Sequence, residues 1–302
     1  MKIQAAIKSM RLRTLPLSLA GVVLGILLAT ADYKVSVWTA VLIMLTTVCL
    51  QILSNLSNEL GDVLHGTDTA DRVGPQYGLN SGAMTVRDMK ILIGTFVGLC
   101  LVSGVAMIWV SFGTLLSMES ICLMLLGAAA ILGAMKYTLG RNPYGYRGLG
   151  DVFVFIFFGI VSVMGAYFVA AHTVHSWYLL LPAASIGFFS VGVLNVNNIR
   201  DMETDAVNRV TVAIRLGEKR AKIYQTVLIV LGWVSMCAYA ALRFFDPWHW
   251  LFVVTLPLYA LHLAGVWKRT GRSLDPMLPL LVISTFLLAL LTGLGFVKYL
   301  LW

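Results

Sequence analysis

The chain has 302 residues, of which 59% are hydrophobic and only 12% are charged. About a quarter of the residues of a soluble domain are charged, so this composition excludes an ordinary soluble enzyme and predicts an all-α integral membrane protein. The net charge of +8 is explained by basic loops beside membrane helices, and we expect no nucleic-acid partner. The four cysteines stand singly in apolar stretches, which argues against a disulfide framework or a cysteine metal site.

Nine apolar stretches follow one another along the chain, and each is long enough to cross a bilayer. We expect membrane helices near residues 15–31, 37–57, 91–111, 118–137, 150–171, 176–197, 223–242, 248–267 and 277–297. The basic N-terminus imitates a signal peptide, but the many spans that follow favour a retained first helix. No linker separates the spans, so residues 1–302 are expected to form a single transmembrane domain.

The basic residues indicate how these helices are oriented. If the N-terminus lies in the cytoplasm and the helices alternate, every Lys and Arg except Lys34, Arg243 and Lys298 falls in a cytoplasmic segment. Cytoplasmic loops of membrane proteins carry such an excess of basic residues. We therefore expect a cytoplasmic N-terminus and a C-terminus on the outer side.

Two acidic stretches follow apolar runs on the predicted cytoplasmic side. They are residues 58–72, after the second run, and residues 197–205, after the sixth. In each, an Asn precedes an Asp by four residues, which places both side chains on one helix face and indicates a weak internal repeat. Either stretch alone could consist of capping and turn residues. The occurrence of both on one side favours a functional site, because carboxylates beside a membrane helix usually have a partner.

The side chains of these stretches suit a metal and a diphosphate. Asn58 and Asp62 form one row of oxygen ligands, and Asn197, Asp201 and Asp205 form a second. Oxygen ligands are those that Mg²⁺ prefers, usually together with substrate phosphates. Basic side chains that could clamp a diphosphate stand nearby. They are Arg72, Lys136, Arg141, Arg147, Arg200 and Arg215.

The loop over residues 136–151 is rich in glycine and contains three tyrosines, Tyr137, Tyr144 and Tyr146. An aromatic belt at the membrane surface would explain tyrosines here. The density of Gly, Tyr and Arg instead favours a loop shaped around an aromatic substrate. The five histidines show no metal-binding or triad spacing.

At these residues the chain resembles the UbiA-type superfamily of intramembrane prenyltransferases, and within it the menaquinone branch. The matching segments are Thr14-Leu15-Pro16, residues 58–62, Gly66-Thr67-Asp68, residues 71–75, residues 143–151, residues 197–205 and residues 213–217. The resemblance implies a nine-helix fold in the bacterial cytoplasmic membrane, with the site facing the cytoplasm. It also implies transfer of a polyprenyl group from polyprenyl diphosphate to 1,4-dihydroxy-2-naphthoate, with loss of the ring carboxylate as CO₂.

The resemblance assigns roles to the residues of the two stretches and the tyrosine loop. One Mg²⁺ would be held by Asn58, Asp62 and Asp68, and another by Asp201 and Asp205. Arg72, Lys136, Arg141 and Arg200 would bind the diphosphate, with Asn197 beside them. Tyr137, Tyr144, Tyr146 and Asp151 would position the acceptor ring. Glu59 stands where the superfamily usually has Asp.

The expected partners are the two substrates and membrane lipid, and the sequence identifies no protein partner. The same chemistry on 4-hydroxybenzoate or a homogentisate-type ring is an alternative. A cation-coupled transporter is a second alternative, but it should carry ionisable groups near the bilayer midplane. The centres of the predicted helices carry almost none.

Overall fold

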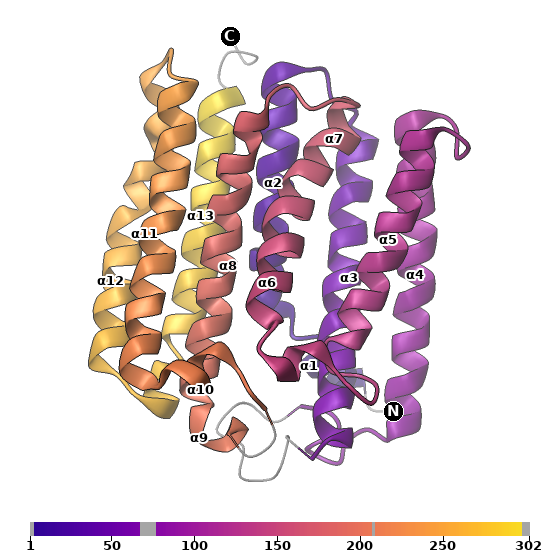
Figure 1. The fold of residues 1–302 in the computed structure, drawn as a ribbon. Helices are drawn as coiled ribbons and strands as arrows, with labels where there is room; N and C mark the ends of the chain where they lie inside the picture. The colour runs from indigo at the N-terminus through magenta and orange to yellow at the C-terminus, as the bar shows by residue number, and fades with distance from the viewer. Residues whose placement is uncertain (1–2, 67–76, 207–208, 298–302) are drawn as a thin grey trace.

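The structure, a computed structural model, describes residues 3–66, 77–206 and 209–297. Within them all regular structure is helical, and nine helices are long and apolar enough to cross a membrane (Figure 1). The expected all-helical fold with nine spans is confirmed. The main helices are α1 (Ile3–Ser9), α2 (Leu15–Asp32), α3 (Val37–Leu64), α4 (Val86–Phe112), α5 (Met118–Lys136), α8 (Leu180–Arg200), α11 (Glu218–Leu242), α12 (Leu256–Lys268) and α13 (Met277–Val297).

Shorter segments complete the bundle. The fifth span is α6 (Gly150–Val154), the π-helical η3 (Phe155–Gly165) and α7 (Ala166–Ala171) in continuous succession. The short helices α9 (Met202–Asp205) and α10 (Val212–Leu216) follow α8. The remaining segments are 3-10 turns at η1 (Leu12–Thr14), η2 (Tyr144–Arg147), η4 (Trp177–Leu179), η5 (Pro247–Thr255) and η6 (Gly271–Leu274).

Several helices extend beyond their predicted bounds. The first span begins at Ile3 because α1 and η1 precede α2. Helix α3 continues to Leu64, so the start of the first acidic stretch is its last two turns. Helix α4 begins at Val86, after a capping box in which Thr85 and Asp88 exchange hydrogen bonds. Polar residues therefore continue these helices past the apolar core, where hydrophobicity alone predicts an end.

The centre of the bundle is formed by α2, α8 and α13, with α11 and α12 on one flank and α4 and α5 on the other (Figure 1). In the most apolar stretch of the sixth span, two thirds of the residues are buried inside the protein. In the corresponding stretch of α5 only 11% are buried. Exposed Val102 and Trp109 on α4 and Leu125 on α5 show the outward apolar face. Such a face suits lipid, as expected of an integral membrane protein.

A buried polar cluster fastens the N-terminal turn to α3. Gln51 lies between Ser18, whose hydroxyl donates to its side-chain carbonyl, and Asn55, 3.1 Å away. The Asn55 amide donates to the Met10 carbonyl at 2.8 Å and to the Thr14 hydroxyl at 3.0 Å. Hydrogen bonds of this kind satisfy polar groups that would otherwise be costly to bury. They hold the α1–α2 turn beside the end of α3.

A second cluster fastens α8 to the C-terminal helices. Asn195 donates to the Ala221 carbonyl at 3.0 Å and to the Gln225 side chain at 2.9 Å. Gln225 in turn meets Nε2 of His262 at 3.0 Å, while Nδ1 of His262 meets the Met277 carbonyl at 3.0 Å. This buried histidine is structural. The cluster fixes the end of α8 that carries the second acidic stretch.

The opposite end of the bundle is closed by an ion pair between distant helices. Arg243 lies 2.6 Å from Oδ1 of Asp32, and its Nη1 also contacts the Tyr239 hydroxyl at 3.0 Å. The Tyr167 hydroxyl donates to Asp32 at 2.8 Å. Arg243, an exception to the predicted charge pattern, thus serves to join the ends of α2 and α11.

The segment η3 crosses α8 closely at Gly159. A Cβ on Gly159 would lie 2.6 Å from the Ala183 carbonyl oxygen and 2.7 Å from the Gly187 Cα. We expect Gly159→Ala to lower the unfolding free energy by about 1–3 kcal/mol, because overpacking forces backbones apart. SDS titration in mixed micelles measures this change. Gly98→Ala on α4, where a Cβ meets nothing, should leave stability unchanged or slightly higher; equal losses in both variants would contradict the crossing.

Candidate active site

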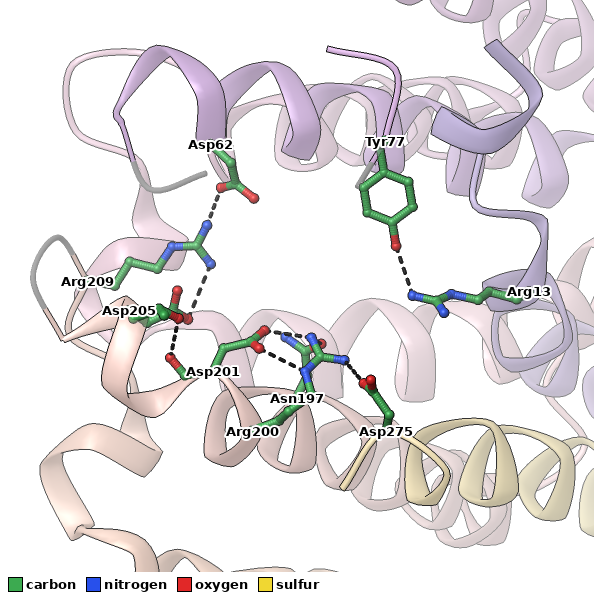
Figure 2. A network of polar contacts seen from close by, with 10 residues as sticks. Arg13, Asp62, Tyr77, Asn197, Arg200, Asp201, Asp205, Arg209 and Asp275 are labelled. Atoms are coloured by element: carbon green, nitrogen blue, oxygen red, sulfur yellow. Dashed lines mark hydrogen bonds and ion pairs between the residues drawn. The ribbon is translucent and has the colours of Figure 1, made fainter. Parts of the chain in front are cut away.

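The described parts of the two acidic stretches meet at one end of the bundle, the end at which α9, α10 and the last turns of α3 lie (Figure 1). Asp62 belongs to the last turn of α3, and Asp205 ends α9. The guanidinium of Arg209 lies between them: one terminal nitrogen bonds Oδ1 of Asp62, and the other lies 3.8 Å from Oδ2 of Asp205 (Figure 2). A cation from the chain itself therefore bridges the two stretches.

Arg200, the last residue of α8, organises a second ion network (Figure 2). It forms a bidentate pair with Asp201, with Nε–Oδ1 2.8 Å and Nη2–Oδ2 2.6 Å. It also donates to Asn197 at 2.8 Å and to Asp275, which precedes α13, at 2.8 Å. The Arg200 and Asp201 side chains are only 3% and 5% exposed. The two aspartates that follow an Asn by four residues, Asp62 and Asp201, are thus each paired with an arginine.

The tyrosine loop contributes directly to the first carboxylate. The Tyr146 hydroxyl donates to Oδ1 of Asp62 at 2.8 Å, and the Arg209 guanidinium lies over the Tyr146 ring at 4.6 Å. His65 packs edge-on against the same ring at 5.2 Å. Burial lowers the pKa of Arg209, but the charges of Asp62 and Asp205 outweigh it and raise that pKa above its usual value. Arg209 is therefore a permanent cation.

A tight contact brings this loop onto α3. Thr138 donates to the Ser57 carbonyl at 2.9 Å and to the Asn58 side chain at 3.3 Å. Gly61 faces Thr138 so closely that any Cβ would lie 2.5 Å from its side chain. The glycine between Asn58 and Asp62 therefore permits the approach. Glu59 points elsewhere, since its Oε1 accepts from the Leu79 backbone at 2.7 Å.

The other residues predicted to position the acceptor, Tyr137, Tyr144 and Asp151, belong to the same loop. A small cavity of about 10 Å³ is lined by Tyr137, Asp151, Asn198, Arg209 and loop glycines. Burial raises the pKa of Tyr137 to about 12, so its hydroxyl stays protonated. Asp151 accepts from the Tyr224 hydroxyl at 3.0 Å. Tyr144 supports the loop, because its hydroxyl donates to the Gly133 carbonyl and its ring stacks on Phe153.

Two of the predicted basic residues, Lys136 and Arg141, are not part of this cluster. Lys136 ends α5 and Arg141 lies in the loop beyond it, both exposed; within the described ranges neither contacts a carboxylate. Asp68 and Arg72 lie outside the described residues. The structure therefore joins Asn58, Asp62, Tyr146 and the second stretch, and of the predicted basic clamp it brings Arg200 to the carboxylates.

Sequence reasoning missed several polar residues at this end. Tyr224 on α11 and Asp275 in the turn before α13 lie far along the chain, and no spacing relates them to either stretch. At the α1–α2 turn, Arg13 donates to the Tyr77 hydroxyl at 2.8 Å, and the Arg11 guanidinium lies 4.0 Å from the Tyr77 ring centroid. Nε and Nη2 of Arg11 are buried and have no hydrogen-bond partner among the described residues. These unsatisfied donors suit an anion.

The side-chain oxygens at this end fit Mg²⁺ when phosphate oxygens complete the set of ligands. Among the described residues, no three Asp, Glu, His or Cys side chains gather closely enough to hold a metal unaided. The oxygens present come from one or two carboxylates and an amide on each side, and Mg²⁺ sites of that composition are completed by substrate phosphates. The position between Asp62 and Asp205 already accepts a positive group. The residues thus fit a metal that shares its ligands with a phosphate.

Loss of Arg200 should destabilise the protein. We expect Arg200→Gln to lower the unfolding free energy by about 3–5 kcal/mol, because Asp201 would remain buried without its partner. Asp275→Asn should cost only about 0–1 kcal/mol, since its side chain is 41% exposed. SDS titration measures both, with exposed Arg220→Gln as the matched charge control. Similar small losses in all three would contradict this network.

Comparison with known proteins places this geometry in a family. The profile of the UbiA prenyltransferase family matches residues 18–276. The chain is 40% identical to the 1,4-dihydroxy-2-naphthoate octaprenyltransferase of Escherichia coli (strain K12) over 97% of this chain and 94% of the relative. It is 37% identical to the enzyme of that description from Mycobacterium tuberculosis, over 89% of this chain and 88% of the relative.

Solved structures share the fold at low sequence identity. The apo structure of a UbiA homolog from Aeropyrum pernix K1 superposes with a TM-score of 0.69 at 18% identity, covering 99% of both chains. A UbiA homolog from Archaeoglobus fulgidus, bound to DMAPP and Mg²⁺, superposes with a TM-score of 0.62 at 15% identity, covering 96% of this chain and 99% of that one. The fold, the matched profile and the long relatives agree: the chain belongs to the UbiA prenyltransferase family.

Proposed function

We propose that this enzyme transfers a polyprenyl group from polyprenyl diphosphate to 1,4-dihydroxy-2-naphthoate and thereby forms demethylmenaquinol, the reduced form of demethylmenaquinone. The observation that carries the proposal is the near-full-length identity, up to 40%, to relatives described as 1,4-dihydroxy-2-naphthoate octaprenyltransferases. In the reaction the allylic C–O bond breaks, a bond forms between the allylic carbon and the ring carbon, and the carboxylate of that ring carbon leaves as CO₂.

The diphosphate would lie between the two acidic stretches, with Mg²⁺ as cofactor. Asn58, Asp62, Asp201 and Asp205 are the proposed ligands, together with Asp68 outside the described residues. Bound Mg²⁺ supplies positive charge opposite the diphosphate as the C–O bond breaks. The proposal is supported by the binding of DMAPP and Mg²⁺ in the related Archaeoglobus fulgidus structure.

The chain's own basic side chains would hold the leaving diphosphate. Arg11 offers two buried nitrogens that bond to nothing within the described ranges, and Arg200 and Arg209 lie beside the carboxylates. Arginine suits this role because its planar fork donates two parallel hydrogen bonds to a phosphate. Arg72, Lys136 and Arg141 remain proposed contacts.

The tyrosine loop would position the acceptor ring next to the carboxylates. Tyr146 already reaches Asp62, and Tyr137 and Asp151 line the cavity behind it. The Tyr137 hydroxyl can donate to a ring oxygen, since its pKa of about 12 keeps it protonated. Apolar helix walls would exclude water from the allylic cation and direct the polyprenyl tail into the bilayer.

The charge pattern supports an orientation for this site. We place the N-terminus and both acidic stretches on the cytoplasmic side of a bacterial inner membrane, because nearly all basic residues cluster at that end. Both proposed substrates have polar head groups that would then enter from the cytoplasm.

An assay in detergent tests the reaction and the acceptor. Purified protein with a labelled polyprenyl diphosphate should prenylate 1,4-dihydroxy-2-naphthoate and release CO₂, and EDTA should abolish turnover until Mg²⁺ is restored. If product forms only with 4-hydroxybenzoate or homogentisate, prenyl transfer stands as the reaction but the proposed acceptor is wrong. Folded protein without product on any ring would contradict prenyl transfer and point to the transporter alternative.

Asp62 and Asp201 should be essential for turnover. We expect Asp62→Asn and Asp201→Asn each to lower kcat by about 10²–10⁴-fold, equal to about 3–5 kcal/mol of barrier, because each loses a proposed metal ligand. Raised Mg²⁺ should recover part of the rate. Thermal denaturation must accompany the assay, since Asp201→Asn also weakens the pair with buried Arg200. Wild-type turnover in both folded variants would refute the metal assignment.

A further inference from the structure

The bridging residue Arg209 has a backbone fixed on both sides. Its amide donates to the Asp205 carbonyl at 2.9 Å, and the next amide, of Val210, donates to the Tyr146 carbonyl at 3.0 Å. Its side chain is 14% exposed, beside Asp62 at 6% and Asp205 at 10%. The guanidinium is therefore held between two acidic stretches that lie more than a hundred residues apart in the sequence.

The charges explain why a cation is needed there. Carboxylates from separate helices repel each other more strongly at a partly buried site than in water. A guanidinium between them relieves the repulsion and keeps both stretches together. The same oxygens, however, are the proposed ligands of Mg²⁺, and an oxygen paired with arginine is less available to a metal.

We propose that Arg209 is a resident counter-ion that competes with the divalent cation for Asp62 and Asp205 and moves onto the diphosphate when metal and diphosphate enter together. This role presupposes the diphosphate binding proposed above, but it is independent of the acceptor ring. Its consequence is coupling: the metal alone binds weakly, and metal with diphosphate binds well. The enzyme thereby selects the complete metal–diphosphate unit.

The chemistry of the side chain suits both positions. A guanidinium fork matches a carboxylate and a phosphate equally well, so the move exchanges one anion for another. The Tyr146 ring, whose centroid lies 4.6 Å from the guanidinium carbon, offers a flat surface along which the cation can shift. Tyr146 also bonds Asp62, so the carboxylate keeps one donor when the arginine leaves.

Binding of Mn²⁺, used as a probe for Mg²⁺, tests this role without catalysis. Free Mn²⁺ would be counted by electron paramagnetic resonance over full-length protein in detergent, with and without saturating inorganic pyrophosphate. Arg209→Gln should bind Mn²⁺ alone about tenfold more tightly than wild type, because the carboxylates are released. With pyrophosphate the order should reverse, and the variant should bind Mn²⁺ more weakly than wild type.

The reversal separates a moving counter-ion from a fixed positive charge. Tighter binding in both conditions, or weaker binding in both, would overturn the proposal. Exposed Arg220→Gln carries the same charge change and should match wild type throughout. Arg209→Lys keeps the charge but not the fork, so its Mn²⁺ affinity relative to wild type should show the same reversal with a smaller difference. This variant decides the question if Arg209→Gln fails to fold. A reversal in protein that prenylates no ring would retain the counter-ion and reject only the acceptor.

Discussion

The arrangement of this protein depends on pairing carboxylates with guanidinium groups at the boundary of a membrane bundle. Asp62, Asp201 and Asp205 are all largely buried, and each has an arginine partner. An unpaired charge in such surroundings would cost several kcal/mol. The acidic site can therefore be assembled before any substrate arrives, and the arginines that assemble it are also suited to bind phosphate.

Much of the fold could be predicted from the sequence, because the length of an apolar stretch is a local property. The helix ends were less predictable. Polar residues of the acidic stretches extend α3 to Leu64 and α8 to Arg200. Hydrogen bonds from the Asn55 side chain, which no hydropathy pattern reveals, hold the α1–α2 turn against α3.

The site was predictable only in part, for a related reason. The four-residue spacing placed Asn58 and Asp62 on one face of α3, and the shared charge pattern indicated that the second stretch would lie nearby. The spacing could not reveal that Arg209 bridges the stretches, that Asp275 completes the Arg200 network or that Tyr144 supports the loop. The first two contacts join residues far apart in the sequence, and the third depends on how the loop folds back on α5, so the residue identities alone carry no signal. The order of the helices around the core determines them.

The ion pair of Asp32 with Arg243 has a mechanical consequence. Together with Tyr167 and Tyr239 it ties α2, α7 and α11 at the end remote from the acidic stretches. An arginine and an aspartate from separate helices resist being parted, because each would be left as an uncompensated, largely buried charge. The far rim of the bundle is therefore held shut by charge as well as by apolar packing.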